Sequence, residues 1–142
     1  MALFSHDTKV DALRRAPLFS ELSRGELEEL AKVTEDLEVE AGKVLCREGE
    51  TAREFFVIVE GEVSVSKDGE EIRTLGPGDF FGEIALLQDV RRTATVMAKT
   101  PLRFFVLTRQ GFRSLVSHQP QIEEQVRQAA EERAGAKDDP TV

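Results

Sequence analysis

The residues best suited to chemistry lie between positions 78 and 96, where glycines, an acid and two arginines follow one another closely. Gly82 permits a close backbone approach or an unusual dihedral angle. The run from Glu83 to Leu87 contains good helix formers, so we expect a short helix to begin there. The first amides of a helix have no partners within it and lie at the positive end of its dipole. This stretch therefore predicts a phosphate-binding helix start.

Charged side chains on either side of this helix start suit different parts of a sugar phosphate. Arg92 is expected to begin a β-branched strand, and its guanidinium can pair with phosphate oxygens. Thr93 adds a hydroxyl donor beside it. The carboxylate of Glu83 would repel a phosphate, but it can accept hydrogen bonds from ribose hydroxyls. The segment therefore matches a sugar phosphate better than a free phosphate.

The elements that must position this segment begin with helices. Residues 7–15 predict a short helix that Pro17 ends. Ser23 and Glu26 have the spacing of a capping box at the start of a second helix.

A series of short strands follows between positions 36 and 108. The apolar run 55–59 predicts a buried strand, and Asp68-Gly69 predicts a tight hairpin, because both residue types tolerate positive φ. Seven or eight short strands with regular turns favour a sandwich or a barrel.

The chain returns to helix after position 109. A short helix is expected over 110–117, and Pro120 fits the first turn of a final helix. One face of that helix carries Ile122, Val126, Ala129 and Arg133.

Composition limits the class of protein. The 142 residues suit one domain, and the net charge of −8 disfavours DNA binding, which a basic face normally drives. We see no secretory signal and no apolar run long enough for a membrane helix, so a cytoplasmic protein without membrane insertion is expected. The single Cys46 is expected to be a buried strand residue in a reducing compartment.

The sequence gives little indication of a metal site or of a catalytic nucleophile. The two histidines, His6 and His118, lie outside the strand region, so the metal site of a cupin-like enzyme cannot be built there. We find no nucleophile elbow, Walker loop or zinc-ligand spacing. We therefore expect no catalytic residues, no metal and no cofactor. A cupin-like enzyme is the rival class, and a metal analysis would test it.

The sequence FGEIALL at 81–87, followed by RRTATV at 91–96, resembles the phosphate-binding cassette of cyclic-nucleotide-binding domains. These domains occur in cyclic-AMP-dependent kinase regulatory subunits, cyclic-nucleotide-gated channels and the catabolite activator family. The resemblance extends over about residues 13–133, and the family's turn glycines match Gly42, Gly49, Gly61 and Gly78. It implies a mainly β fold, an eight-stranded jelly-roll barrel or double-stranded β-helix, with an N-terminal helical pair and C-terminal lid helices.

The resemblance implies a single domain with four parts. These are an N-terminal helical segment at 1–34, a jelly roll at 35–108 with its cassette at about 78–96, C-terminal helices at 109–135, and a disordered tail at 136–142.

The family roles imply a ligand site built around the cassette. Glu83 would accept the ribose 2′-hydroxyl, the amides of Gly82, Ile84 and Ala85 would meet ribose and phosphate, and Arg92 would pair with the phosphate. The full expected set of ligand-binding residues is Phe81, Gly82, Glu83, Ile84, Ala85, Arg92, Thr93, Ala94 and Arg133.

The nucleotide base would be read by two of these residues. The final helix is similar to the lid helix of bacterial cyclic-nucleotide-gated channel domains, and Arg133 matches by spacing the arginine that stacks on adenine there. Thr93 keeps cyclic GMP open as a ligand, because its hydroxyl can bind a guanine in the syn conformation. Cyclic AMP is the expected ligand, and cyclic GMP is the alternative.

The resemblance implies a sensor rather than an enzyme. Ligand binding would move the C-terminal helix, which would contact an unknown protein partner or a second copy of the chain. Little chain follows Arg133, so we expect no DNA-reading domain. A ligand-free scaffold of the same fold is a further alternative.

Overall fold

The computed structural model describes residues 8–88 and 90–135. Its helices are α1 (Lys9–Arg15), α2 (Arg24–Lys32), α3 (Glu83–Gln88), α4 (Arg109–His118) and α5 (Pro120–Gly135), with a short 3-10 turn, η1 (Pro17–Phe19). Its strands are β1 (Glu35–Val39), β2 (Val44–Cys46), β3 (Glu54–Glu60), β4 (Val63–Lys67), β5 (Glu70–Leu75), β6 (Phe80–Phe81), β7 (Thr95–Ala98) and β8 (Leu102–Thr108). The predicted tail at 136–142 lies outside the described residues, as does Asp7 at the predicted start of the first helix.

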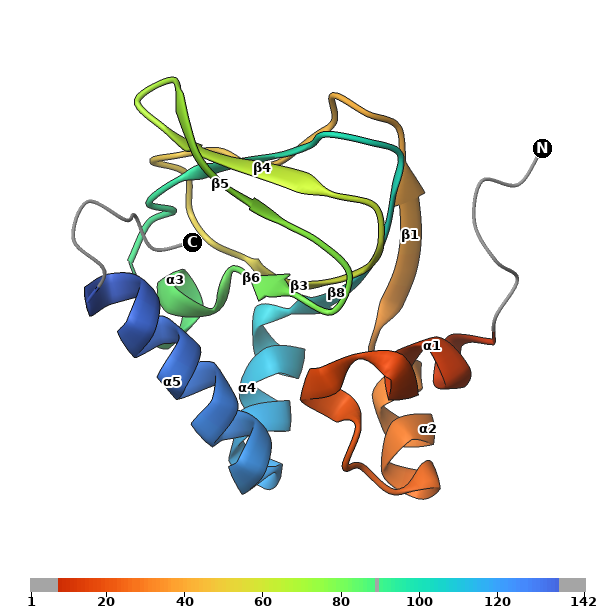
Figure 1. The fold of residues 1–142 in the computed structure, drawn as a ribbon. Coiled ribbons are helices and arrows are strands. Elements are labelled where there is room, and N and C mark those ends of the chain that lie inside the picture. Colours follow the sequence, from red (N-terminus) through yellow and green to blue (C-terminus); the bar gives the residue numbers. More distant parts are fainter. Residues whose placement is uncertain (1–7, 89, 136–142) are drawn as a thin grey trace.

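The strands form two four-stranded antiparallel sheets, with the orders β1-β8-β3-β6 and β2-β7-β4-β5. The expected eight-stranded jelly roll with flanking helices is confirmed. Among the described strands no pairing joins one sheet to the other, so the fold is a sandwich rather than a closed barrel. Figure 1 shows α1, α2, α4 and α5 gathered below the sheets, with α3 beside α5.

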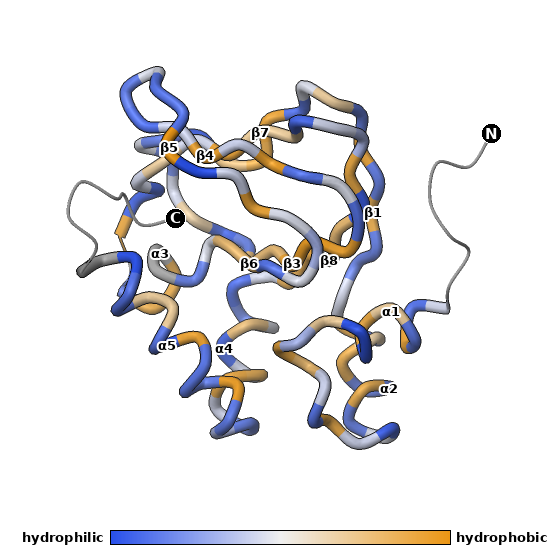
Figure 2. The backbone as a smooth tube through the Cα atoms, in the orientation of Figure 1, coloured by the Kyte–Doolittle hydropathy of each residue, from blue (hydrophilic) through white to orange (hydrophobic). Residues whose placement is uncertain are grey.

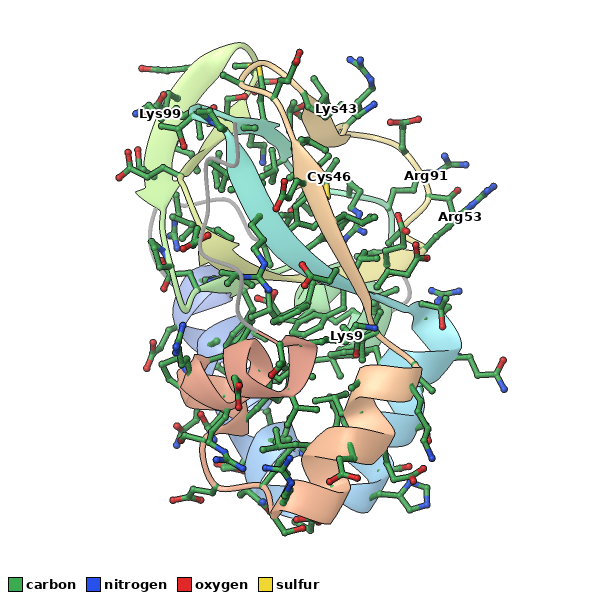
Figure 3. The ribbon with its side chains drawn as sticks, turned by 90° about the vertical axis from the view of Figure 1, so that its right-hand side faces the viewer. Lys9, Lys43, Cys46, Arg53, Arg91 and Lys99 are labelled. Atoms are coloured by element: carbon green, nitrogen blue, oxygen red, sulfur yellow. The ribbon has the colours of Figure 1, made fainter. Side chains whose placement is uncertain are left out.

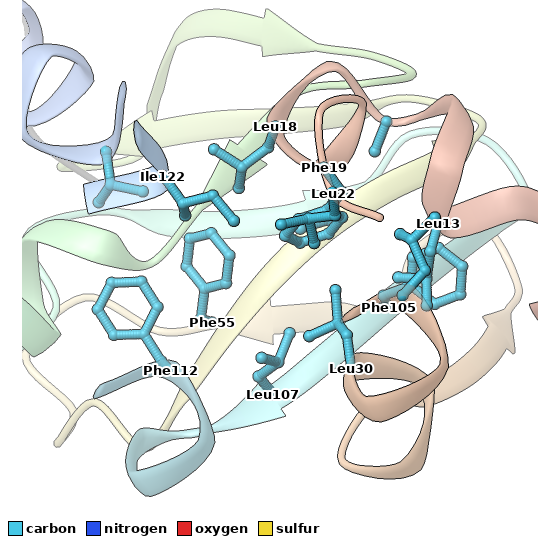
Figure 4. Packing of buried hydrophobic residues seen from close by; sticks show 14 of the residues in the cluster. Leu13, Leu18, Phe19, Leu22, Leu30, Phe55, Phe105, Leu107, Phe112 and Ile122 are labelled. Carbon is cyan, nitrogen blue, oxygen red and sulfur yellow. The ribbon is translucent and has the colours of Figure 1, made fainter. Parts of the chain in front are cut away.

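The core has two layers because β3 is buried on both of its faces. Phe55 and Val57 point into a cluster between the first sheet and the helices, which includes Phe105 and Phe112 (Figure 4). Phe56 and its neighbours on the opposite face pack between the two sheets. Figure 2 shows that hydrophobic and hydrophilic residues follow one another along the strands and helices. The predicted buried strand at 55–59 thus lies within β3.

Local signals in the sequence correspond to local geometry. Ser23 and Glu26 form both hydrogen bonds of a capping box at the start of α2. Asp68 and Gly69 have φ values of 52° and 81°, as a tight Asp-Gly hairpin between β4 and β5 requires. Within the described residues, no helix combines the length and the apolar character needed to cross a membrane.

Candidate functional site

Gly82 joins the short strand β6 to helix α3, and the guanidinium of Arg92 lies against it. Arg92 Nη1 donates to the Gly82 carbonyl at 3.2 Å, and Nη2 donates to the Glu54 carbonyl at 2.7 Å. Gly82 has a φ of +96°, and a Cβ there would lie 2.8 Å from Arg92 Nη1 and 2.9 Å from Glu54 O. Only glycine fits this close approach without displacing its neighbours.

Arg92 is buried and has no carboxylate partner among the described residues. Its side chain lies over the ring of Phe56, with 5.8 Å between Cζ and the ring centroid, and the residue is 6% exposed. Its two hydrogen-bond acceptors are neutral carbonyls, and no carboxylate of the described residues lies within salt-bridge distance. A buried cation held only by neutral groups is well suited to pair with an incoming anion.

The Glu83 carboxyl, at the start of α3, is completely buried and is reached by the last helix. Arg133 of α5 donates from Nη1 to Glu83 Oε1 at 2.6 Å and from Nη2 to the Phe80 carbonyl at 2.9 Å. The Arg133 guanidinium also lies 5.3 Å from the centre of the Phe80 ring. The other carboxyl oxygen, Glu83 Oε2, is buried and has no hydrogen-bond partner among the described residues. Glu83 therefore retains capacity to accept a hydrogen bond.

Burial raises the pKa of Glu83 above its ordinary value, although the charges of Arg133 and Arg92 act in the opposite direction. Because the folded state holds this proton more tightly than the unfolded chain, protonation stabilises the fold. The stabilisation by protonated Glu83 is fully present below about pH 4.5, the ordinary pKa of a glutamate. It is lost as the pH rises through the raised pKa of the folded state.

We expect the ligand-free protein to lose stability relative to its Glu83→Gln variant between pH 4.5 and neutral pH, because glutamine does not ionise. Thermal melts of both proteins across this range would measure the difference. Glu71→Gln is the control, since Lys99 lowers the pKa of that exposed carboxyl and gives any pH effect the opposite sign. A difference between the protein and Glu83→Gln that stays constant with pH would contradict a raised pKa.

The structure brings four of the predicted site residues together: Gly82, Glu83, Arg92 and Arg133. Ile84 and Ala85 belong to the first turns of α3. Thr93 is partly buried and Ala94 is buried, both just before β7. The expectation that Arg92 begins a strand is wrong, because β7 begins at Thr95 and Arg92 lies in the preceding loop.

Phe81 contributes to the core rather than to an open surface. Its ring is completely buried and stacks on Phe56, with 4.7 Å between centroids and 10° between ring planes. The side chain is therefore not accessible in this structure, and the contact of Phe81 with a ligand stays a prediction.

Two residues near the site were not singled out from the sequence. The Phe80 carbonyl accepts a hydrogen bond from Arg133, and Arg73 of β5 lines a pocket of about 480 Å³ together with Phe80, Ala129 and Arg133. Burial and the charge of Arg133 lower the pKa of Arg73. Arg73 precedes the buried Leu75 by two positions, so strand alternation could have placed both on the same face.

A second pocket, of about 500 Å³, reaches Arg92 from the loop between β2 and β3. Its lining includes Cys46, Gly49, Arg53 and Arg91, and Figure 3 shows both of these arginines on this side of the molecule. Burial raises the pKa of the Cys46 thiol to about 12, so the thiol is protonated at neutral pH. Among the described residues, no group of three or more histidine, cysteine, aspartate or glutamate side chains could hold a metal ion.

Fold and site together define a jelly-roll domain in which Arg92 contacts Gly82, and Glu83 pairs with Arg133 of the C-terminal helix. The family model described as "Cyclic nucleotide-binding domain" matches residues 36–119. The chain belongs to this family.

Similar proteins include channels and kinase regulators. The chain is 40% identical to a cyclic nucleotide-gated potassium channel of Rhizobium etli, over 84% of this chain and 33% of the channel. It is 41% identical to a cAMP-dependent protein kinase regulatory subunit of Yarrowia lipolytica, over 73% of this chain and 28% of the subunit. The cAMP-bound structure of PfPKA-R superposes with a TM-score of 0.78 at 28% identity, covering 87% of this chain and 43% of that one. The chain thus spans about a third of the length of these curated relatives.

Proposed function

We propose that this domain is a sensor that binds one cyclic nucleotide, cyclic AMP in the first place, with Arg92 at the phosphate and Glu83 at the ribose. The observation that carries this proposal is that Arg92 contacts Gly82, while the neighbouring Glu83 has a buried carboxyl oxygen without a hydrogen-bond partner among the described residues. Both side chains thus retain unused capacity, since the hydrogen-bond partners of Arg92 are neutral. The cyclic phosphate carries one negative charge and can serve as the anionic partner of Arg92. The ribose 2′-hydroxyl can donate a hydrogen bond to Glu83.

The bond between Glu83 and Arg133 gives the ligand a means of moving the last helix. A ribose hydroxyl that donates to Glu83 Oε2 would weaken the hold of Arg133 on Oε1, because both groups then draw on the one negative charge of the same carboxylate. Arg133 released from Glu83 would turn its guanidinium plane to the purine, as it now lies over Phe80. Such an exchange changes the contacts of α5 in the two states, which is the requirement for a ligand-driven shift.

Nuclear magnetic resonance of the isotopically labelled protein tests this exchange. Saturating cyclic AMP is expected to shift the backbone amides of Gly82 and Glu83, and the Arg133 side chain and the amides of α5 with them. Cassette shifts without any change along α5 would sink the proposed helix movement while leaving ligand binding intact.

Cyclic GMP is the alternative ligand, and Thr93 is the residue that favours it. Thr93 follows Arg92 and is partly exposed, and a threonine hydroxyl is a group that can hydrogen-bond a guanine in the syn conformation. We expect Thr93→Ala to weaken cyclic GMP binding about five- to tenfold and to leave cyclic AMP binding within about twofold, since one hydrogen bond is at stake. Competition of both nucleotides against one fluorescent analogue measures the two affinities. An equal loss for both ligands would remove Thr93 from base recognition.

A ligand-free scaffold is the second candidate, and one observation favours it. The Arg133 guanidinium already occupies one oxygen of Glu83, so the site is partly satisfied by the chain itself. Absence of cyclic nucleotide binding in a protein with an intact fold would favour this reading.

We further propose that the domain acts by binding alone, without a catalytic step, a metal or another cofactor, and that it works in the cytoplasm. Its acidic charge supports a role without DNA. The moved α5 or the N-terminal helices would contact a protein partner or a second copy. Metal analysis of the purified protein tests the rival metal-dependent enzyme.

A further inference from the structure

Helices α2 and α4 border a groove of about 440 Å³. Its apolar lining comes from Leu22, Leu30 and Val33 on one side and Leu115 on the other. Figures 1 and 3 both place the two helices at the same end of the molecule. None of the predicted ligand-binding residues lines the groove, so it is separate from the proposed nucleotide site.

The apolar lining reaches the surface. Val33, which ends α2, is 57% exposed, the highest value among the large apolar side chains exposed in the described part of the chain. Leu22 and Leu30 lie deeper and belong to the core beneath the first sheet. The apolar lining of the groove thus runs from the core to the exposed Val33, so an apolar group that covered it would remove further apolar surface from water.

The charged groups that line the groove are acidic. Glu26 and Glu29 of α2 lie on its wall, His118 ends α4 on the other side, and no lysine or arginine belongs to its described lining. Glu29 is paired only with the exposed Lys32, and such surface pairs contribute little. An occupant with positive charge beside its apolar contacts is therefore favoured over a neutral or acidic one.

A side-chain hydrogen bond links the two walls of the groove. The Gln119 amide, at the junction of α4 and α5, donates to Glu26 Oε2 at 2.6 Å. The other oxygen of Glu26 accepts from the Ser23 amide in the capping box, which also fixes the start of α2. Such a preformed surface loses little conformational entropy when a partner binds.

We propose that this groove binds an amphipathic helix of a partner protein whose apolar stripe is bordered by lysine or arginine. Two neighbouring helices with an apolar channel between them match the i, i+3, i+4 and i+7 anchors of a docked helix. A second copy of this chain fits less well, because it carries a net charge of −8 and would bring a second pair of glutamates to the same rim.

A designed peptide pair tests the proposal directly. One synthetic peptide of roughly 15 residues, long enough for some helix in isolation, carries leucines at i, i+3, i+4 and i+7 with lysines beside them. The second carries glutamate in place of every lysine. The basic peptide is expected to bind and to shift the amides of Gly25, Gly111 and Leu115 in nuclear magnetic resonance spectra, whereas the acidic peptide is not.

Matched substitutions on α2 locate the binding. Glu29→Lys is expected to weaken the basic peptide roughly fivefold, while Glu28→Lys, the same charge change on a residue outside the groove, leaves its affinity unchanged. Val33→Asp, at an exposed position where the fold tolerates a polar group, is expected to abolish the groove shifts. Thermal melts confirm that each variant is folded.

Equal binding of both peptides, equal effects of the two lysine substitutions, shifts outside the groove, or no binding would each overturn the proposal. Concentration-dependent dimers that Val33→Asp dissolves would assign the groove to a second copy instead. None of these results bears on cyclic nucleotide binding, because the two sites share no residue.

Discussion

Arg92→Leu is expected to weaken cyclic AMP binding by about 100-fold or more. Removal of one partner of a buried charge pair costs about 2–5 kcal/mol, and each 1.4 kcal/mol corresponds to a tenfold change in affinity. Arg92 is buried and has no carboxylate partner among the described residues, so its charge is not already neutralised by the protein. Calorimetric titration of the variant measures the loss.

Arg91→Leu is the matched control, because it removes the same charge from the adjacent position. Arg91 is exposed and donates a hydrogen bond to the Gly49 carbonyl, so we expect an affinity change of less than about threefold. Arg92→Leu also removes two hydrogen bonds to buried carbonyls and should lower the melting temperature. Unchanged cyclic AMP affinity in a folded Arg92→Leu protein would remove Arg92 from the site.

Gly82→Ala is expected to disrupt the cassette through sterics alone. The added methyl would lie 2.8 Å from Arg92 Nη1 and 2.9 Å from the Glu54 carbonyl, and the residue has a φ of +96°. Strain of this kind costs of order 1–3 kcal/mol, and displacement of Arg92 should also weaken cyclic AMP binding at least tenfold.

Gly42→Ala is the control that separates the cost of a positive φ from the steric contact between residue 82 and Arg92. Gly42 has a φ of +94°, nearly the same as Gly82, but a Cβ there meets nothing within 4 Å. Both variants should lose stability in thermal melts, and only Gly82→Ala should lose ligand affinity. Equal affinity losses in the two would show that contact between Gly82 and Arg92 is not required.

Much of the fold could be predicted from the sequence because its signals are local. The capping box of Ser23 and Glu26 and the hairpin of Asp68 and Gly69 depend on residues close in the chain. Strand alternation and turn residues indicated the number of strands, and the cassette resemblance indicated the jelly roll. The pairing order of the two sheets does not follow from local patterns, since β1 pairs with β8 and β2 with β7.

The site was predicted only in part, because its decisive contacts join distant segments. The ion pair of Glu83 and Arg133 spans 50 positions, and the bond from Arg92 to the Glu54 carbonyl spans 38. The residue types and their spacing indicated that Glu83 and Arg92 could serve a sugar phosphate. They did not indicate that Arg133 binds the carboxylate expected to receive ribose, which appears only when α5 packs beside α3.

Arg133 thus joins Glu83 and Arg92 as a third charged residue of the candidate site. Cyclic nucleotide binding and the position of α5 are linked if both the ribose and Arg133 bind the carboxylate of Glu83. The assignment of each ligand contact remains a prediction that the variants above address.

Isothermal titration of the purified domain with cyclic AMP at neutral pH tests the central claim most directly. We predict saturable heat with one nucleotide bound per chain, competition by cyclic GMP, and loss of the signal in Arg92→Leu. No saturable heat with either nucleotide at sub-millimolar protein and ligand, in a protein whose thermal melt shows a cooperative fold, would contradict the account.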